Sequence, residues 1–246
     1  MNVLITGGSR GIGRATAVLA GAQHWNVGVN YRDDAAAAEE TVLAVKKIGG
    51  NAVAIRGDVA IEKDVIAMFD AMEMSFGYQT GLVNNAGITA PLSDLADMTA
   101  ERLKRVFDVN IFGAYLCARE AARRFSTRRG GKGGVIVNVS SAASRLGSPH
   151  EYVDYAGSKG AMDSLTLGLA RELGQEGVRV NAVRPGIIAT EIHQLSGEPG
   201  RAARLGPAMP IGRPGTAEEV AEAILWLLSD ASSYVTGALL DVAGGR

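Results

Sequence analysis

The feature that most constrains the fold of this chain is the regular alternation of short apolar runs with longer stretches of helical periodicity. Seven apolar runs lie near residues 2–6, 27–30, 52–55, 82–83, 135–139, 178–183 and 238–242. Nearly all of their residues are apolar, which is typical of strands covered on both faces. Helical spacing fills the stretches between them, as at residues 61–76 and 152–174. This pattern predicts a parallel sheet between two helical layers.

Glycines mark the ends of these runs. There are 32 among 246 residues, well above the average share of about 7%. They do not form a tract, so they indicate tight turns and close approach of the backbone to a ligand. About seven strands favour an open, doubly wound sheet over a closed barrel of eight units. No break in composition divides the chain, so we expect one α/β domain of the Rossmann type over residues 1–246.

Composition excludes several classes of protein. The net charge of −1 gives no field that would collect nucleic acid or an anionic membrane. One cysteine rules out a disulfide framework, and with only three histidines it argues against a metal site. Cys117 lies in an apolar run, where we expect a buried, inert thiol. No run has the length of a membrane span and no basic leader precedes the first strand, so we expect a cytoplasmic protein.

The turn after the first predicted strand has the pattern of a phosphate-binding turn. Residues 6–13 read TGGSRGIG, with Gly7, Gly11 and Gly13 in the order T-G-x-x-x-G-x-G. Such glycines let a pyrophosphate approach the N-terminus of a helix, where free N–H groups favour an anion. A P-loop is excluded because Arg14 follows Gly13. A simple tight turn remains the alternative, but the position after the first strand favours phosphate binding.

A tyrosine and a lysine are spaced four residues apart in a predicted helix. Tyr155 and Lys159 therefore lie on one helical face. An ordinary surface pair is the alternative interpretation. However, the preceding strand ends in Ser140-Ser141, at the carboxyl edge of the sheet where doubly wound folds bind ligands.

Together these motifs resemble the short-chain dehydrogenase/reductase family, over the whole length from the first strand to the C-terminus. The resemblance is carried by the turn at 6–13, the sequence NNAG at 84–87, Asn110, Ser141, Tyr155 with Lys159, and the sequence PGIIAT at 185–190. The chain is most similar to the acyl-carrier-protein reductases and glucose dehydrogenases of the family. One departure is Ser144, where the family often has glycine. The serine that matches the catalytic one is Ser141 rather than Ser140.

The resemblance implies hydride transfer between a nicotinamide and a carbonyl or alcohol carbon. Tyr155 would be the general acid or base and Ser141 would hold the substrate oxygen, while Asn110 would hold a water that links Lys159 to solvent. Lowering a tyrosine pKa from about 10 by about 3 units requires about 4 kcal/mol. One cation near 4 Å, at an effective dielectric of about 20, supplies roughly that amount. Lys159 is such a cation, and oxidised nicotinamide would be another.

The cofactor is expected to be NADP(H), with NAD(H) as the alternative. An NAD-dependent protein of this fold places an acidic residue at the end of the second strand, where this chain has Tyr31 followed by Arg32. Arg32 and Arg10 would bind a 2′-phosphate, although Asp33 and Asp34 could weaken the preference. The expected cofactor-binding residues are Gly7, Ser9, Arg10, Gly11, Ile12, Gly13, Tyr31, Arg32, Asp58, Val59, Asn85, Ala86, Gly87, Tyr155, Lys159, Pro185, Gly186, Ile188 and Thr190.

Several assignments stay open on the sequence. Asp58 would contact adenine or cap the third strand. Residues 191–214, rich in glycine and proline, lack periodicity, and we expect them to form a mobile substrate lid. The roles of His150, Glu151 and His193 near that lid are not fixed by any pattern.

The leading hypothesis is an NADP(H)-dependent oxidoreductase that acts on a small carbonyl or alcohol compound. A non-catalytic sensor of NADP(H) is the alternative, although intact Ser141, Tyr155 and Lys159 argue against it. Epimerisation of nucleotide sugars would need a larger C-terminal region. The family resemblance further implies a homotetramer, assembled through the helices of residues 100–128 and 152–174 and through the C-terminal helix and strand.

Overall fold

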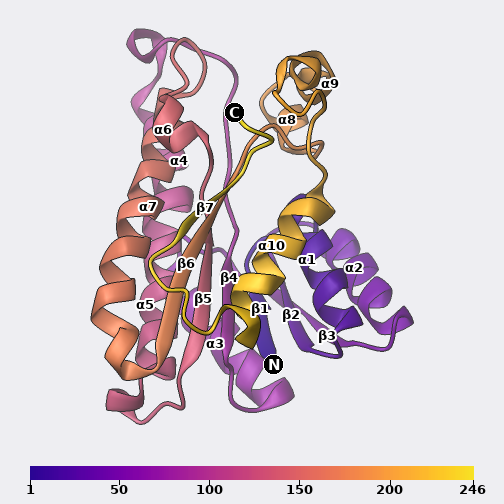
Figure 1. Ribbon diagram of the computed structural model, residues 1–246, viewed down its shortest axis with the longest axis vertical. Coiled ribbons are helices and arrows are strands. Elements are labelled where there is room, and N and C mark those ends of the chain that lie inside the picture. The colour runs from indigo at the N-terminus through magenta and orange to yellow at the C-terminus, as the bar shows by residue number, and fades with distance from the viewer.

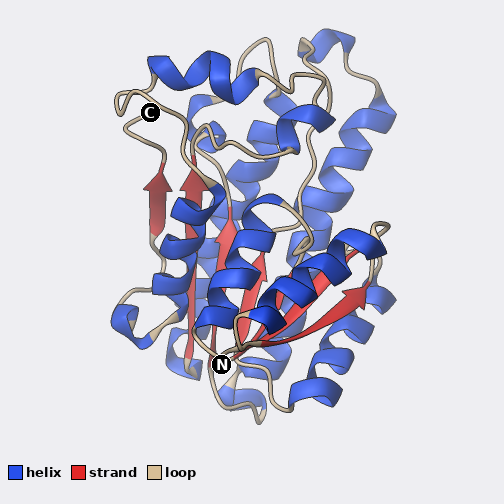
Figure 2. Cartoon of the chain, turned by 90° about the vertical axis from the view of Figure 1, so that its right-hand side faces the viewer, coloured by secondary structure: helices blue, strands red, loops and turns tan.

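Seven parallel strands form the centre of the computed structural model, in the order β3-β2-β1-β4-β5-β6-β7. The structure describes the backbone of residues 1–246 and all side chains except those at positions 193 and 195. The strands point to one end of the molecule (Figure 2), and the strand order reverses at β1, which pairs with both β2 and β4. The predicted doubly wound sheet is confirmed. The strands are β1 (Asn2–Ile5), β2 (Asn26–Tyr31), β3 (Asn51–Arg56), β4 (Gly81–Asn84), β5 (Gly134–Val139), β6 (Val178–Pro185) and β7 (Leu239–Val242).

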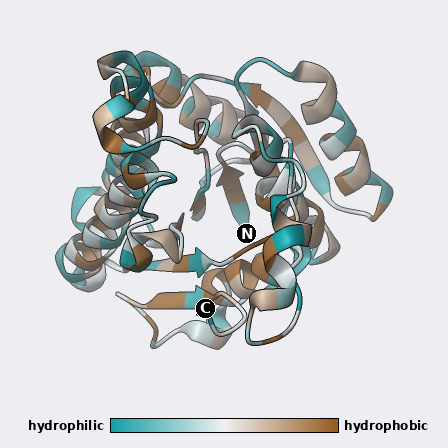
Figure 3. Ribbon diagram, turned by 90° about the horizontal axis from the view of Figure 1, so that it is seen from above, coloured by the Kyte–Doolittle hydropathy of each residue, from teal (hydrophilic) through white to brown (hydrophobic). Residues whose placement is uncertain are grey.

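Helices cover both faces of the sheet, as Figure 1 shows. Alternate strand residues supply the two cores: Val3 and Ile5 pack on one face, and Leu4 packs on the other. Seen from above, the strands carry hydrophobic stretches between these layers (Figure 3). One face is covered by α1 (Gly11–Ala22), α2 (Ala35–Lys47) and α10 (Ala217–Leu228); the other is covered by α3 (Glu62–Phe76), α4 (Ala100–Phe107), α5 (Ala114–Phe125) and α7 (Val153–Leu173).

Polar side chains cap several helices. Thr99 caps α4 through the Arg102 N–H at 3.2 Å, and Thr216 begins α10 with a capping box that Glu219 completes. Asp34 caps α2, because its carboxylate accepts the Ala37 N–H at 3.0 Å. A π-helical turn, Asp108–Gly113, lies between α4 and α5.

The stretch 191–214 was expected to lack regular structure, and that expectation is wrong. It contains two short helices, α8 (Ile192–Leu195) and α9 (Arg201–Leu205). They lie beyond the carboxyl ends of the strands (Figures 1 and 2). Ion pairs from Arg201 to Glu198 and Glu151, at 2.6 and 2.5 Å, fix α9 where sequence periodicity gave no signal. His193 has a side chain outside the described part of the chain.

Three further features bear on function. Cys117 is buried, and burial raises the pKa of its thiol to about 12, which keeps the thiol protonated and unreactive. Among the described residues, no helix has the length and apolar character needed to cross a membrane. The same residues hold no group of three or more side chains that could bind a metal ion.

Candidate active site

A cleft of about 470 Å³ opens at the carboxyl ends of β1, β4, β5 and β6. It brings together three predicted catalytic residues and most of the predicted cofactor residues. Those lining it are Gly7, Arg10, Gly11, Ile12, Asn85, Ala86, Gly87, Ser141, Tyr155, Lys159, Pro185, Gly186, Ile188 and Thr190. The predicted residues outside its described lining are Ser9, Gly13, Tyr31, Arg32, Asp58, Val59 and Asn110.

The phosphate turn forms one end of this cleft. Gly7 and Gly11 have positive φ angles of 61° and 50°, a conformation that glycine adopts without strain. A Cβ on Gly13 would lie 2.4 Å from the Gly7 carbonyl oxygen, so only glycine lets the turn fold onto α1. No described side chain caps the N-terminus of α1, and its first turn carries no acidic residue. Its free N–H groups and helix dipole therefore suit the pyrophosphate of a dinucleotide.

Neighbouring strands hold this turn in place. The Thr6 hydroxyl accepts the Asn85 and Ala86 N–H groups, both at 2.9 Å. The Asn85 amide donates to the carbonyls of Thr6 and Gly7 at 2.9 and 3.1 Å. On the other side, the buried Asn30 side chain accepts the Gly7 N–H at 3.1 Å. The sequence analysis missed Asn30, although a polar residue inside an apolar strand run was a signal that could have found it.

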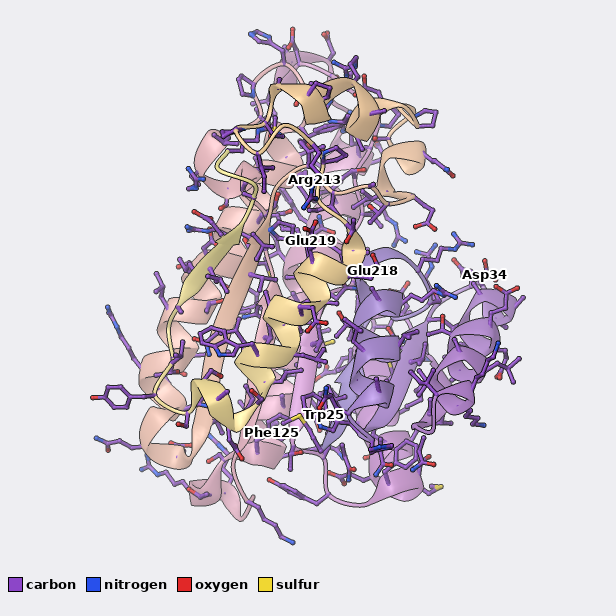
Figure 4. The ribbon with its side chains drawn as sticks, turned by 45° about the vertical axis from the view of Figure 1, so that its right-hand side comes forward. Trp25, Asp34, Phe125, Arg213, Glu218 and Glu219 are labelled. Carbon is purple, nitrogen blue, oxygen red and sulfur yellow. The ribbon has the colours of Figure 1, made fainter. Side chains whose placement is uncertain are left out.

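The two arginines expected at the 2′-phosphate are paired with aspartates. Arg10 contacts Asp34, and Arg32 contacts Asp33 at 2.5 Å. Figure 4 shows Asp34 at the start of α2, at the outer side of the molecule and away from Arg213 and Glu219 at the start of α10. Hydrogen bonds to the Ala37 backbone and to Arg10 lower the pKa of Asp34. Arg10 lines the cleft, whereas Arg32 is outside its described lining.

Asp58 takes the capping role that was its alternative assignment. Its carboxylate accepts the Ala60 N–H at 2.9 Å, and its own N–H donates to Asp64 at 3.1 Å. These bonds shape the turn that follows β3. The bond from Ala60 uses one of the two carboxylate oxygens, and the adenine contact stays a prediction.

Tyr155, Ser141 and Lys159 converge at the other end of the cleft. The Ser141 hydroxyl hydrogen-bonds the Tyr155 phenol. The Lys159 ammonium is buried, donates to the Val139 carbonyl at 2.7 Å, and lies 5.6 Å from the centre of the Tyr155 ring. Burial lowers the pKa of Lys159 to about 8, against the opposing effect of Asp163.

The pKa of Tyr155 differs from the expectation. Burial raises it to about 12, and the hydrogen bond from Ser141 only partly opposes this. The sequence argument placed the Lys159 charge close enough to lower the pKa, but it omitted the desolvation of the phenolate. In this protein Lys159 alone does not outweigh that desolvation.

The structure separates the two neighbouring serines. Ser140 is buried, and its hydroxyl donates to the Lys159 backbone carbonyl at 3.1 Å and to the Asp163 carboxylate at 2.7 Å. The Ser141 hydroxyl is directed to Tyr155 and the Ala143 N–H, which lies at 3.1 Å. The geometry therefore favours Ser141 as the serine that can meet a substrate oxygen.

Asn110 lies in the π-helical turn and is almost completely buried. Its amide nitrogen donates to the Ile88 carbonyl at 2.9 Å and to Ser158 at 3.0 Å, and its oxygen accepts the Ile88 N–H at 2.8 Å. These bonds tie the segment after β4 to α7. An amide oxygen can accept two hydrogen bonds, and the water expected at Asn110 stays a prediction.

Comparison with known proteins decides the family. Residues 7–246 match the family model described as enoyl-(acyl carrier protein) reductase. The uncharacterized oxidoreductase YgfF of Escherichia coli is 52% identical over 243 residues, which cover 99% of this chain and 98% of that protein. This chain belongs to the short-chain dehydrogenase/reductase family. It is thus an oxidoreductase of the kind that acts on alcohol and carbonyl carbons with a nicotinamide cofactor, as the resemblance implied.

Other members of the family have similar length and structure. Glucose 1-dehydrogenase 2 of Bacillus subtilis is 39% identical, with 98% of this chain and 93% of the relative covered. A short-chain dehydrogenase/reductase from Mycobacterium marinum superposes with a TM-score of 0.92 at 35% identity, covering 99% of this chain and 94% of that structure. Levodione reductase superposes with a TM-score of 0.91 at 32% identity, covering 99% and 96%.

The cleft is also lined by residues that were not among the predicted site residues, and three of them bear on the argument below. Thr89 follows the NNAG motif, Tyr152 directly precedes α7, and Arg201 belongs to α9. Local sequence patterns could not identify Arg201 as a cleft residue, because its position depends on its ion pair with Glu151, fifty residues earlier.

Proposed function

We propose that this protein is an NADP(H)-dependent oxidoreductase that interconverts a carbonyl and an alcohol, with Tyr155 as general acid and base. The observation that carries this proposal is the convergence of Ser141, Tyr155 and Lys159 at one end of a cleft whose other end is the phosphate turn. Its relatives include proteins named as dehydrogenases of a hydroxysteroid, glucose and L-rhamnose, all of which are alcohols.

The chain's residues manage the proton and the substrate oxygen. The nicotinamide dinucleotide that the cleft fits supplies the hydride in reduction and accepts it in oxidation. In reduction, the carbonyl carbon gains that hydride and its oxygen gains the proton of the Tyr155 hydroxyl. Ser141 donates a hydrogen bond that orients the oxygen. Lys159 stabilises the phenolate left on Tyr155, and Asn110 holds α7 in register with the segment after β4.

NADP(H) is proposed over NAD(H) on the charges near the end of β2. Tyr31 ends that strand, so the strand end carries no carboxylate of its own to accept the ribose 2′-hydroxyl. Arg10 lines the cleft with a half-exposed guanidinium that suits phosphate, although it is paired with Asp34 in this structure. Direct titration with NADPH and NADH tests this: we expect NADPH to bind about tenfold more tightly, and tighter binding of NADH would contradict it.

Segment 191–214 is proposed as the substrate lid of a single catalytic domain, residues 1–246. Its helices α8 and α9 line the cleft through Ile192, Gln194 and Arg201. Proteolysis without ligand should cut within this segment first, and NADPH should protect it. Equal resistance of the segment and the sheet would contradict a lid.

A cytoplasmic homotetramer is also proposed. The helices predicted for one interface expose Phe107, Phe112 and Tyr115, and the C-terminal helix α10 exposes Trp226. Apolar groups of this size on helix faces suit symmetric association. Light scattering at micromolar concentration tests it, and a monomer mass would refute it.

Activity is tested with a panel of carbonyls and alcohols, with both cofactors, by absorbance of the reduced nicotinamide. Turnover that disappears in Tyr155→Phe, with NADPH binding retained, is the expected result. Binding of NADPH without turnover of any compound would favour the non-catalytic sensor instead.

A further inference from the structure

Two residues that line the cleft have buried hydroxyl groups with no hydrogen-bond partner among the described residues. These groups are Tyr152 Oη and Thr89 Oγ1. Both residues line the same cleft as Tyr155. Buried polar groups in folded proteins are nearly always paired, because an unpaired one loses its bonds to water without replacement. Two such groups beside a reacting centre therefore indicate a ligand that supplies the missing bonds.

The backbone fixes the positions of both residues. Tyr152 precedes Tyr155 by three residues at the start of α7, and its N–H donates to the Ser148 carbonyl at 3.1 Å. Thr89 follows the NNAG motif by two residues, in a segment joined to the start of α7 by the bond from Ser93 N–H to the Glu151 carbonyl at 3.1 Å. Both residues thus lie on segments tied to the start of α7, and both line the cleft that Tyr155 also lines.

The charge around Tyr152 points to a neutral ligand. The Arg201 guanidinium lies 5.1 Å from the centre of the Tyr152 ring and is 4% exposed. It already pairs with Glu151 at 2.5 Å and with Glu198 at 2.6 Å. An anionic substrate would therefore meet two carboxylates rather than a free cation.

We propose that Tyr152 and Thr89 bind a second hydroxyl of the substrate, on the carbon next to the reacting one. The substrate class is then a neutral vicinal diol, oxidised to the corresponding α-hydroxy ketone, or that ketone in the reverse direction. This inference rests on the proposed function, since Tyr155 must act on the first oxygen. A substrate without the second hydroxyl leaves both protein hydroxyls unpaired, which is how a site rejects a deoxy analogue.

The test compares matched alcohols that differ only in the second hydroxyl: cyclohexanol with cyclohexanediol, and propanol with propanediol, the hydroxyls of each diol on adjacent carbons. Lactate serves as the anionic counterpart of propanediol. Values of kcat/KM are measured for the unmodified protein, Tyr152→Phe and Thr89→Val. Tyr234→Phe is the control, because it makes the same chemical change at a fully exposed tyrosine.

The unmodified protein should prefer each diol over its mono-alcohol by about tenfold or more, and lactate should be a poor substrate. Tyr152→Phe and Thr89→Val should each reduce kcat/KM for the diols by about tenfold while changing that for the mono-alcohols by less than about twofold. The control should change neither. This dependence on the substrate hydroxyl is a coupling that a purely structural role would not produce.

The inference would be overturned if a variant lost kcat/KM equally for diols and mono-alcohols. It would also be overturned if the unmodified protein had the same kcat/KM for a mono-alcohol as for the matching diol. Preference for lactate over propanediol would also overturn it. In each of these results the oxidoreductase function stands. If instead no compound is oxidised or reduced with either cofactor, or Tyr155→Phe retains full turnover, the proposed function fails and the inference fails with it.

Discussion

The two ends of the cleft hold their charged groups in opposite ways. At the catalytic end, Lys159 and Asp163 are buried beneath the site, and Asp163 bonds Ser140 at 2.7 Å and Arg184 at 2.9 Å. At the outer end, Arg10 and Asp34 form a pair whose side chains are 54% and 39% exposed. One end is a connected, largely buried network, and the other is a set of surface pairs.

This difference predicts where the protein tolerates change. The ion pair at the catalytic end is that of Asp163 with Arg184, and removing one partner of such a largely buried pair typically costs about 3–5 kcal/mol, because the remaining charge stays buried. Exposed pairs contribute about 0–1 kcal/mol and are screened by salt. The catalytic end therefore fixes a geometry, whereas the outer end can be altered to change cofactor choice without loss of the fold.

The largest effect is expected for Tyr155→Phe. The change removes the proton donor and keeps the ring, so kcat should fall by about a thousandfold or more. The phosphate turn is unchanged, so NADPH should still bind. Steady-state kinetics and fluorescence titration measure the two quantities, with Tyr234→Phe as the control at an exposed position. Near-full activity would remove Tyr155 as the acid.

The next effect is expected for Lys159→Met, which should reduce kcat by about a hundredfold but stabilise the fold. Burial lowers the pKa of Lys159 from its ordinary 10.5 to about 8, so the native protein pays to keep it charged below that pH. The variant should gain about 1–2 kcal/mol in the free energy of unfolding at neutral pH, after the lost bond to Val139 is subtracted.

The pH dependence of this gain has a defined direction. Between about pH 8 and 10.5 the unfolded chain holds a proton on Lys159 that the native protein has released, so the unmodified protein becomes more stable as pH rises. The advantage of Lys159→Met should shrink across this window and vanish above it. Urea unfolding at several pH values measures it, with Lys47→Met on α2 as the exposed control. A variant less stable at every pH would contradict the burial argument.

The sequence predicted the parts of this site that depend on neighbouring residues. The turn at Gly7–Gly13 and the Tyr155–Lys159 spacing follow from local periodicity and were found. What it could not predict depends on contacts between distant segments. The π-helical turn forms because Asn110 bonds Ile88 across 22 residues, and α9 is fixed by the pair of Arg201 with Glu151. The pKa of Tyr155 depends on burial, which no local pattern measures.

A moderate effect is expected for the double variant Tyr31→Asp, Arg32→Ala at the outer end. The new carboxylate would accept the ribose 2′-hydroxyl of NADH and repel a 2′-phosphate. The order of affinities should reverse, with NADH bound about tenfold more tightly than NADPH, a change of about 1.4 kcal/mol relative to equal binding. Tyr31→Phe, Arg32→Ala is the matched control without the new acid. Retained preference for NADPH would show that the end of β2 does not select the cofactor.

The smallest effect is expected for Asp34→Asn, which releases Arg10 from its exposed ion pair. Asparagine is as good a helix cap as aspartate, so α2 should keep the bond to the Ala37 N–H and the protein its stability. The freed guanidinium should bind the 2′-phosphate more strongly, and affinity for NADPH should rise by about threefold at low salt while that for NADH stays unchanged. Glu172→Gln, an exposed change of the same charge near the end of α7, should alter neither affinity. Titration with both cofactors at low and high salt measures this. The gain in NADPH affinity should fade as salt screens Arg10. An equal gain in NADH affinity would contradict the prediction, because it would mean that Asp34 repels the pyrophosphate rather than occupying Arg10.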